Sequence, residues 1–173
     1  MHLKTLLFLL FSSILSTLSF NLVAEEYQSS ADFINTAFDN HPPKPKSLWV
    51  SKGIKAPVTK ILQHKPGFMR TRYWRNGDKT VWVLNEIGKT KLISVGIIIE
   101  NNRISLLKVL AFRESRGWEV KHDFFTDQFK QVALTDDNAL DAPIDGISGA
   151  TLSVQALSKT AQLALFFNQH IQQ

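Results

Sequence analysis

The sequence predicts an α+β fold in which helices pack on one side of an antiparallel sheet. Four strand-like segments follow one another between residues 69 and 112, joined by short turns. An apolar-faced helical segment, residues 152–168, then closes the chain. A run of strands followed by a helix, without regular alternation of the two, is typical of this class. The length of 173 residues suits one modest domain.

The first 24 residues have the composition of a secretory signal peptide. Lys4 is the only formal charge before an apolar run over residues 6–22, and Ala24 stands directly before two glutamates. A basic start, an apolar run and a small residue at its end are the features of an export signal. Serines and threonines interrupt the run, which favours cleavage after Ala24 over retention as a membrane anchor, although the sequence leaves cleavage itself open. We therefore expect an exported, soluble protein that does not span the membrane once the signal is removed.

Residues 25–62 are expected to form an N-terminal segment that is partly helical and partly extended. Apolar residues at helical spacing predict a helix over residues 29–38, and the three prolines that follow must end it. Residues 48–62 stay ambiguous, because Gly53 and Pro57 interrupt an otherwise helical apolar face. The rest of the chain, residues 63–173, is assigned to the main domain.

Two turn signals divide the strand region into two hairpins. Asn76-Gly77 separates the first two strand-like runs, and Asn101-Asn102 separates the second two. Asparagine and glycine tolerate the left-handed backbone that tight hairpin turns require. The apolar run over residues 95–99 predicts a central strand that is covered on both faces.

The most informative stretch is the polar turn over residues 145–151 (DGISGAT), which leads into the C-terminal helix. Gly149 and Ala150 leave room for close approach of a ligand to the backbone. The threonine hydroxyl of Thr151 can be esterified, and the helix start would point free N–H groups and a positive dipole end at an anion. The same residue types also form ordinary turns and helix caps.

This turn resembles the flavinylation motif of the FMN-binding domain family, which includes the FMN-carrying subunits of the Na+-pumping NADH:quinone oxidoreductase and of the Rnf complex. In that family the threonine that closes Ser-Gly-Ala-Thr carries FMN through a phosphoester bond, and Thr151 is the matching position. Residues 113–117 resemble the family's Glu-Thr-x-Gly segment, with Ser115 in place of threonine. The resemblance covers about residues 92–167. It implies the following cofactor-binding residues: Glu114, Ser115, Gly117, Asp145, Ser148, Gly149, Ala150 and Thr151.

The resemblance implies a periplasmic electron-transfer flavoprotein with covalent FMN, passing electrons between a membrane-bound redox protein and an acceptor. A threonine hydroxyl is a poor nucleophile on its own, so the resemblance also implies a flavin transferase that uses FAD and Mg2+. No residue is expected to be catalytic, and enzyme status is left open, with an electron carrier favoured. The alternative is a periplasmic accessory or redox-sensing binding module of a membrane complex, without covalent flavin.

Other kinds of site have little support. There is no cysteine, the histidines lack metal-ligand spacing, and no nucleotide-phosphate motif occurs, so no metal site is expected. The net charge of +5 suits an anionic surface or an acidic partner, and the export signal argues against nucleic acid. Trp82 and Trp118 could stack on a flavin ring, but packing is the more ordinary role.

Glu114 allows two interpretations. It tunes the flavin region, as the resemblance implies, or it is a loop carboxylate that is either solvated or paired with an arginine, since Arg113 and Arg116 are close in sequence. The sequence does not determine the electron donor, the acceptor, the redox potential or the oligomeric state.

Overall fold

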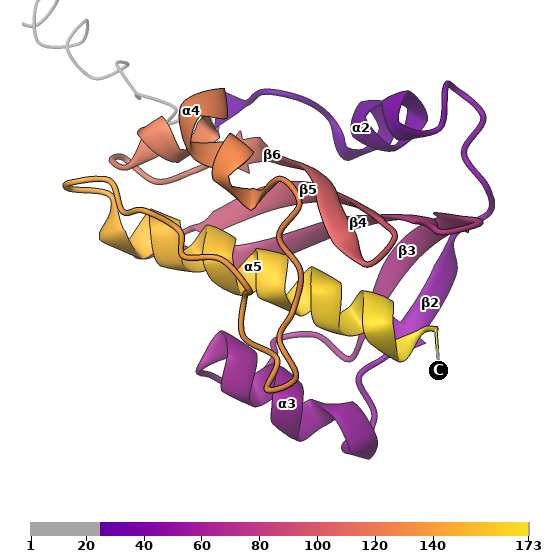
Figure 1. Cartoon of the computed structure of the whole chain (residues 1–173). Coiled ribbons are helices and arrows are strands. Elements are labelled where there is room, and N and C mark those ends of the chain that lie inside the picture. Colours follow the sequence, from indigo (N-terminus) through magenta and orange to yellow (C-terminus); the bar gives the residue numbers. More distant parts are fainter. Residues whose placement is uncertain (1–24, 173) are drawn as a thin grey trace, which may run out of the picture.

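The computed structural model describes residues 25–172; the predicted signal peptide, residues 1–24, lies outside the described residues. One antiparallel sheet has the strand order β1-β6-β5-β4-β3-β2 (Figure 1). The strands are β1 (Glu25–Glu26), β2 (Lys46–Trp49), β3 (Arg70–Asn76), β4 (Lys79–Ile87), β5 (Leu92–Glu100) and β6 (Arg103–Phe112). The helices are α2 (Ser30–Ala37), α3 (Lys52–Leu62), α4 (Asp123–Thr126) and α5 (Thr151–His170), with 3-10 turns η1 (Trp118–Lys121) and η2 (Asp127–Phe129). The predicted α+β class is confirmed.

Both predicted hairpins are present. The pairing of β3 with β4 ends at the pair Asn76 and Lys79, and Gly77 in the turn between them has a φ of 58°. The pairing of β5 with β6 ends at the pair Glu100 and Arg103, and the two asparagines between them have φ values of 52° and 62°. The second hairpin therefore has left-handed backbone at both central residues, and the first has it at Gly77. Such turns match the right-handed twist of the flanking strands, which is why asparagine and glycine are favoured there.

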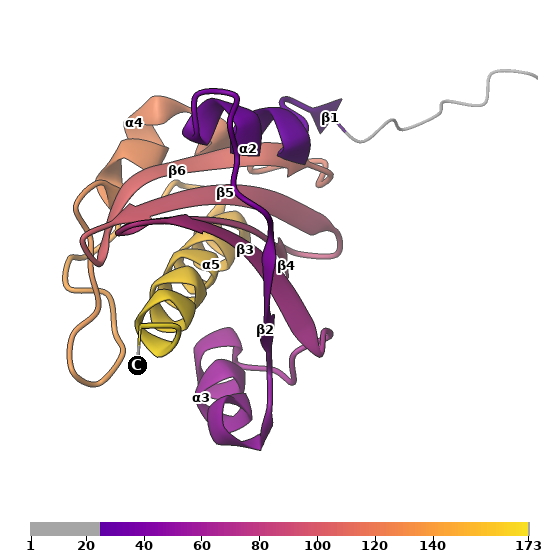
Figure 2. The ribbon, with the colours of Figure 1, turned by 90° about the vertical axis from the view of Figure 1, so that its right-hand side faces the viewer.

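The main core lies between one face of the sheet and α5, with α3 packed beside that helix (Figures 1 and 2). Trp82 on β4 is fully buried in it, stacked on Tyr73 at 4.9 Å and 5.7 Å from the ring of Phe167. The indole N–H donates to Thr80 Oγ1 at 3.0 Å, and that hydroxyl donates to Asn168 Oδ1 at 2.7 Å. Trp82 is therefore a packing residue whose polar atom is satisfied inside the core.

The opposite face of the sheet carries α2, which corrects the expectation of helices on one side only (Figure 2). Phe33 of α2 lies directly over Gly96, where an added Cβ would stand 2.6 Å from the phenyl ring. Only glycine in this central strand allows the helix to approach so closely. Ile97 and Ile99 face the α5 side and Ile98 faces α2, so the prediction of a strand covered on both faces is confirmed.

Residues 25–62 are built into the same sheet and core. β1 pairs with the end of β6 and β2 pairs with β3, so this segment supplies both edge strands. The ambiguous stretch resolves into β2 followed by α3, which contains Pro57. Burial of the apolar face of α3 against α5 offsets the hydrogen bond that this proline cannot donate. The buried residues of that face are Ile54, Val58, Ile61 and Leu62.

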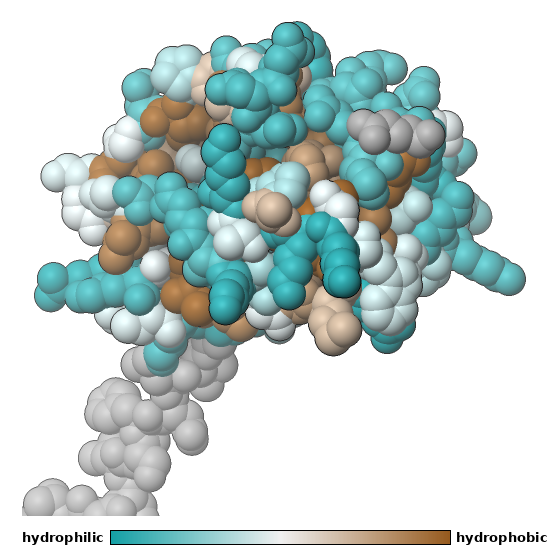
Figure 3. Space-filling model, turned by 90° about the horizontal axis from the view of Figure 1, so that it is seen from below, coloured by the Kyte–Doolittle hydropathy of each residue, from teal (hydrophilic) through white to brown (hydrophobic). Residues whose placement is uncertain are grey.

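The two ends of α5 lie at opposite ends of the sheet. At its C-terminal end, Asn168 Nδ2 donates to Asn102 Oδ1 at 2.9 Å and Arg75 donates to the carbonyl of Ile171 at 3.3 Å, so this end lies beside the two hairpins. The helix therefore starts at the other end, beside the β4–β5 loop and the residues that follow β6. None of the helices within residues 25–172 combines the length and apolar character needed to cross a membrane. On the side of α3, hydrophobic areas of the surface are interrupted by hydrophilic ones (Figure 3).

Candidate functional site

Three segments that are distant in sequence meet around the start of α5. They are the β4–β5 loop, the residues that follow β6, and the turn that leads into the helix. Together they enclose a pocket of about 620 Å³. The lining residues are Lys89, Glu114, Ser115, Arg116, Gly149, Ala150, Thr151, Leu152 and Ser153. The exposed Thr151 thus opens onto a cavity.

The start of α5 offers free hydrogen-bond donors to this pocket. Gly149 has a φ of 82°, and Ala150 is the N-cap residue, without a side-chain cap. The first turn contains no acidic residue, and the first helical bond runs from Val154 N to Ala150 O at 3.0 Å. The N–H groups just before Val154 are therefore available to an anion, with a helix-dipole contribution of about 0.3–1 kcal/mol.

Gly117 lets the segment after β6 approach the helix start. Its φ is 84°, and an added Cβ would stand 2.6 Å from Ser153 Oγ and 3.4 Å from Ala150 Cβ. Both the left-handed backbone and the short contact require glycine. Gly117 therefore brings the segment after β6 close to the helix start, and it is not one of the residues that line the pocket.

Glu114 fastens the β4–β5 loop to the pocket. Its Oε1 accepts the backbone N–H groups of Lys89, Thr90 and Lys91 at 2.6, 2.6 and 2.7 Å. Burial alone would raise the pKa of this carboxyl, but the hydrogen bonds outweigh it and the pKa of Glu114 is lowered. Arg113 instead donates to Ser94 Oγ at 2.9 Å. Of the two interpretations of Glu114, pairing with an arginine is replaced by these bonds to the loop backbone, and its place in the pocket agrees with the flavin interpretation.

Replacing Glu114 by glutamine is expected to lower the free energy of unfolding by about 1–2 kcal/mol at pH 7, because a charged acceptor of several N–H groups is lost on a half-exposed loop. A lowered pKa in the folded state means that the carboxylate stabilises the fold above its unfolded pKa, and this is lost as the pH falls through the folded value. The difference from wild type should therefore shrink between pH 7 and pH 3 in urea titrations. Glu26→Gln, at an exposed glutamate, serves as control; an equal difference at both pH values would contradict this role.

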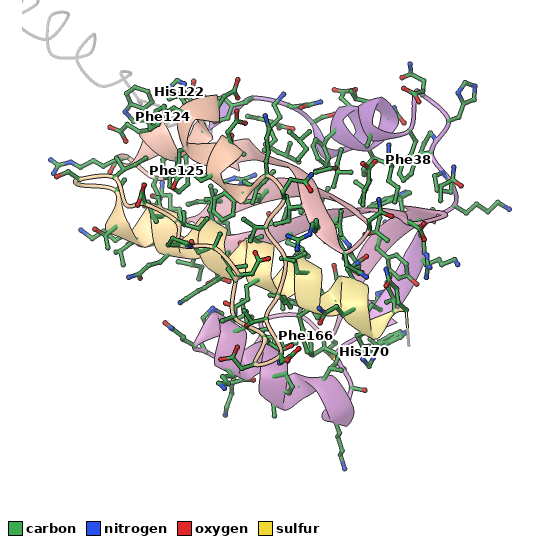
Figure 4. The ribbon with its side chains drawn as sticks, in the orientation of Figure 1. Phe38, His122, Phe124, Phe125, Phe166 and His170 are labelled. Atoms are coloured by element: carbon green, nitrogen blue, oxygen red, sulfur yellow. The ribbon has the colours of Figure 1, made fainter. Side chains whose placement is uncertain are left out.

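The remaining predicted residues lie near the pocket but outside its lining. Asp145 and Ser148 are exposed, and the backbone N–H of Asp145 donates to Gln128 Oε1 at 2.7 Å, which holds the motif turn against η2. Trp118 is exposed as well and lies edge-on to His122, with ring centres 5.4 Å apart. His122 and Phe124 lie at the end of the molecule where α5 begins (Figure 4). Within residues 25–172, no three potential ligands gather as a metal site.

Sequence reasoning did not assign Lys89, Arg116, Leu152 or Ser153 to the site. Arg116 and Ser153 stand close to recognised positions, so proximity in sequence was an available signal for them. Nothing local marks Lys89, because the bonds from its loop to Glu114 are what bring it to the pocket.

The fold and the site define a small α+β domain with a pocket that opens beside an exposed threonine at an uncapped helix start. In a comparison with protein families, residues 88–165 match the FMN-binding domain. This match confirms the resemblance for that segment and supports FMN as the cofactor. Searches of curated proteins and of solved structures gave no match.

Proposed function

We propose that this protein is a periplasmic electron-transfer flavoprotein that carries FMN on Thr151 through a phosphoester bond. One observation carries the proposal: the threonine of the family's motif stands exposed at an uncapped helix start, inside a pocket lined by two cations. A helix start without a side-chain cap or an acidic residue in its first turn is suited to a phosphate. The residues present therefore fit the phosphate end of FMN.

In this proposal the chain's own residues hold and orient the cofactor. Thr151 supplies the ester oxygen, the first N–H groups of α5 face the phosphate, and Gly149 and Ala150 keep side chains out of its way. The bound flavin supplies one- and two-electron redox chemistry. Covalent attachment suits an exported carrier, because a freely dissociating cofactor would be lost from the periplasm. The electrons would pass between a membrane-bound redox protein and an acceptor.

Attachment requires a separate flavin transferase that uses FAD and Mg2+. The threonine oxygen forms the new bond to the flavin phosphate, the phosphate–phosphate bond of FAD breaks, and AMP leaves as the hydroxyl proton is released. Glu114 is the one carboxylate that lines the pocket. Three backbone N–H groups already donate to this carboxylate and its pKa is lowered, so Glu114 is a weak base. Its environment therefore favours a partner enzyme over self-attachment.

Intact-mass spectrometry tests the proposal. The full chain is produced with and without a flavin transferase in a bacterial host, and the exported protein is isolated from each culture. We expect the mass of one FMN, less water, to be added only with the transferase, together with in-gel flavin fluorescence after denaturation. An exported chain that keeps its unmodified mass beside an active transferase would contradict the proposal and favour an accessory module without covalent flavin.

A further inference from the structure

Two basic side chains in the pocket have no acidic partner. Lys89 and Arg116 both line it. The ion pairs found among residues 25–172 involve neither of them. The carboxylate beside them, Glu114, accepts the loop backbone, Lys89's own N–H included. Glu114 therefore positions the backbone of Lys89 and leaves the ammonium group free to meet a ligand.

A hydroxyl of a largely buried residue in the same pocket also has no hydrogen-bond partner in the described part of the chain. Ser153 is 4% exposed, lines the pocket and points its Oγ toward Gly117. Further along α5, Ser158 and Thr160 donate to the carbonyls four residues before them at 3.0 and 2.7 Å. Ser153 makes no such bond, and no other hydrogen-bond partner of its Oγ occurs in the described part of the chain. Because Ser153 lines the pocket, this unpaired hydroxyl is open to the pocket and can donate to a ligand atom there.

The net charge of the pocket would be neutralised by one anion that carries a single negative charge. Lys89 and Arg116 contribute two positive charges and Glu114 contributes one negative charge, which leaves a net charge of about +1 beside the positive end of α5. A phosphodiester carries one negative charge at neutral pH. Such a group would neutralise the pocket, whereas an uncharged ligand would leave it positive.

We propose that Lys89, Arg116 and Ser153 bind the phosphate of the flavin on Thr151, the two cations through charge-assisted hydrogen bonds and the serine through its hydroxyl. This inference rests on the proposed function and adds the side chains that recognise the phosphate. None of these three residues lies within the motif turn, residues 145–151. Lys89 is the least expected, since it reaches the site through the β4–β5 loop.

The first test compares melting temperatures of the flavinylated and unflavinylated protein. Lys89→Gln and Arg116→Gln are combined in one variant, and the control combines Lys91→Gln with Lys108→Gln, which removes the same charge outside the pocket lining. We expect flavinylation to raise the melting temperature of wild type and control equally, and to raise that of the pocket variant by less than half as much. An equal rise in all three proteins would overturn the inference.

The second test separates phosphate contacts from ring contacts. Unflavinylated protein is titrated with FMN and with riboflavin, which lacks the phosphate, while flavin fluorescence is followed. The pocket variant should bind FMN about tenfold more weakly than the control does, with riboflavin binding unchanged. Ser153→Ala should weaken FMN binding severalfold with the same selectivity. Equal losses for both flavins would overturn the inference, and intact mass shows independently whether Thr151 is modified, so the proposed function can stand if this inference fails.

Discussion

Thr151→Ala is expected to give a stably folded protein that carries no covalent flavin. The substitution removes the single oxygen that would form the ester, and no neighbouring hydroxyl in the Ser-Gly-Ala-Thr turn occupies the same place at the helix start. Thr151 is exposed at the first position of α5, so the free energy of unfolding should change by no more than about 0.5 kcal/mol. Intact mass and in-gel fluorescence after coexpression with a flavin transferase measure the loading.

Two matched variants make this result specific. Thr151→Ser keeps a hydroxyl in place and should retain part of the loading, whereas Thr59→Ala removes a threonine of α3 and should load like wild type. Flavin that remains attached in the Thr151→Ala protein would show that another residue carries it. Loss of flavin loading together with a strongly lowered melting temperature would show instead that Thr151 is needed for the fold.

Gly117→Ala is expected to destabilise the protein by about 2–5 kcal/mol and to reduce flavin loading strongly. A left-handed backbone costs a residue with a Cβ about 1–2 kcal/mol, and the contact 2.6 Å from Ser153 Oγ adds a packing cost of about 1–3 kcal/mol. To relieve the contact, the segment after β6 or the start of α5 must move, and both carry the pocket. Urea unfolding measures the first effect and intact mass the second.

The double variant Gly117→Ala with Ser153→Ala separates the cost of the left-handed backbone from the cost of the close contact. Removing the serine hydroxyl should recover the packing part of the loss and leave the backbone part. Gly53→Ala is the control, because that glycine lies in α3 with open space around its Cβ position and a helical backbone. It should be neutral or stabilising by up to about 1 kcal/mol. A Gly117→Ala protein as stable as wild type would refute the tight approach of the two segments.

Local chemistry made several elements predictable. Asn101-Asn102 and Gly77 mark turns through their backbone preferences, and the prediction was confirmed at both hairpins. The apolar spacing of α5 and the polar turn before it identified the helix and its start, where we propose that the cofactor is held. In each case the deciding interaction lies within a few residues along the chain, and therefore the sequence displays it directly.

Which surfaces meet was decided only by the tertiary structure. The apolar face of α2 predicts burial, but its place opposite α5 depends on the absence of a side chain at Gly96, far along the chain. Edge pairing likewise brings residues 25–62 into the sheet, and the bonds of Glu114 bring Lys89 to the pocket. The class of the domain, its turns and the residue proposed to carry FMN thus follow from local patterns along the chain. The charged surroundings of that residue come from contacts between distant segments, which local preferences along the chain do not encode.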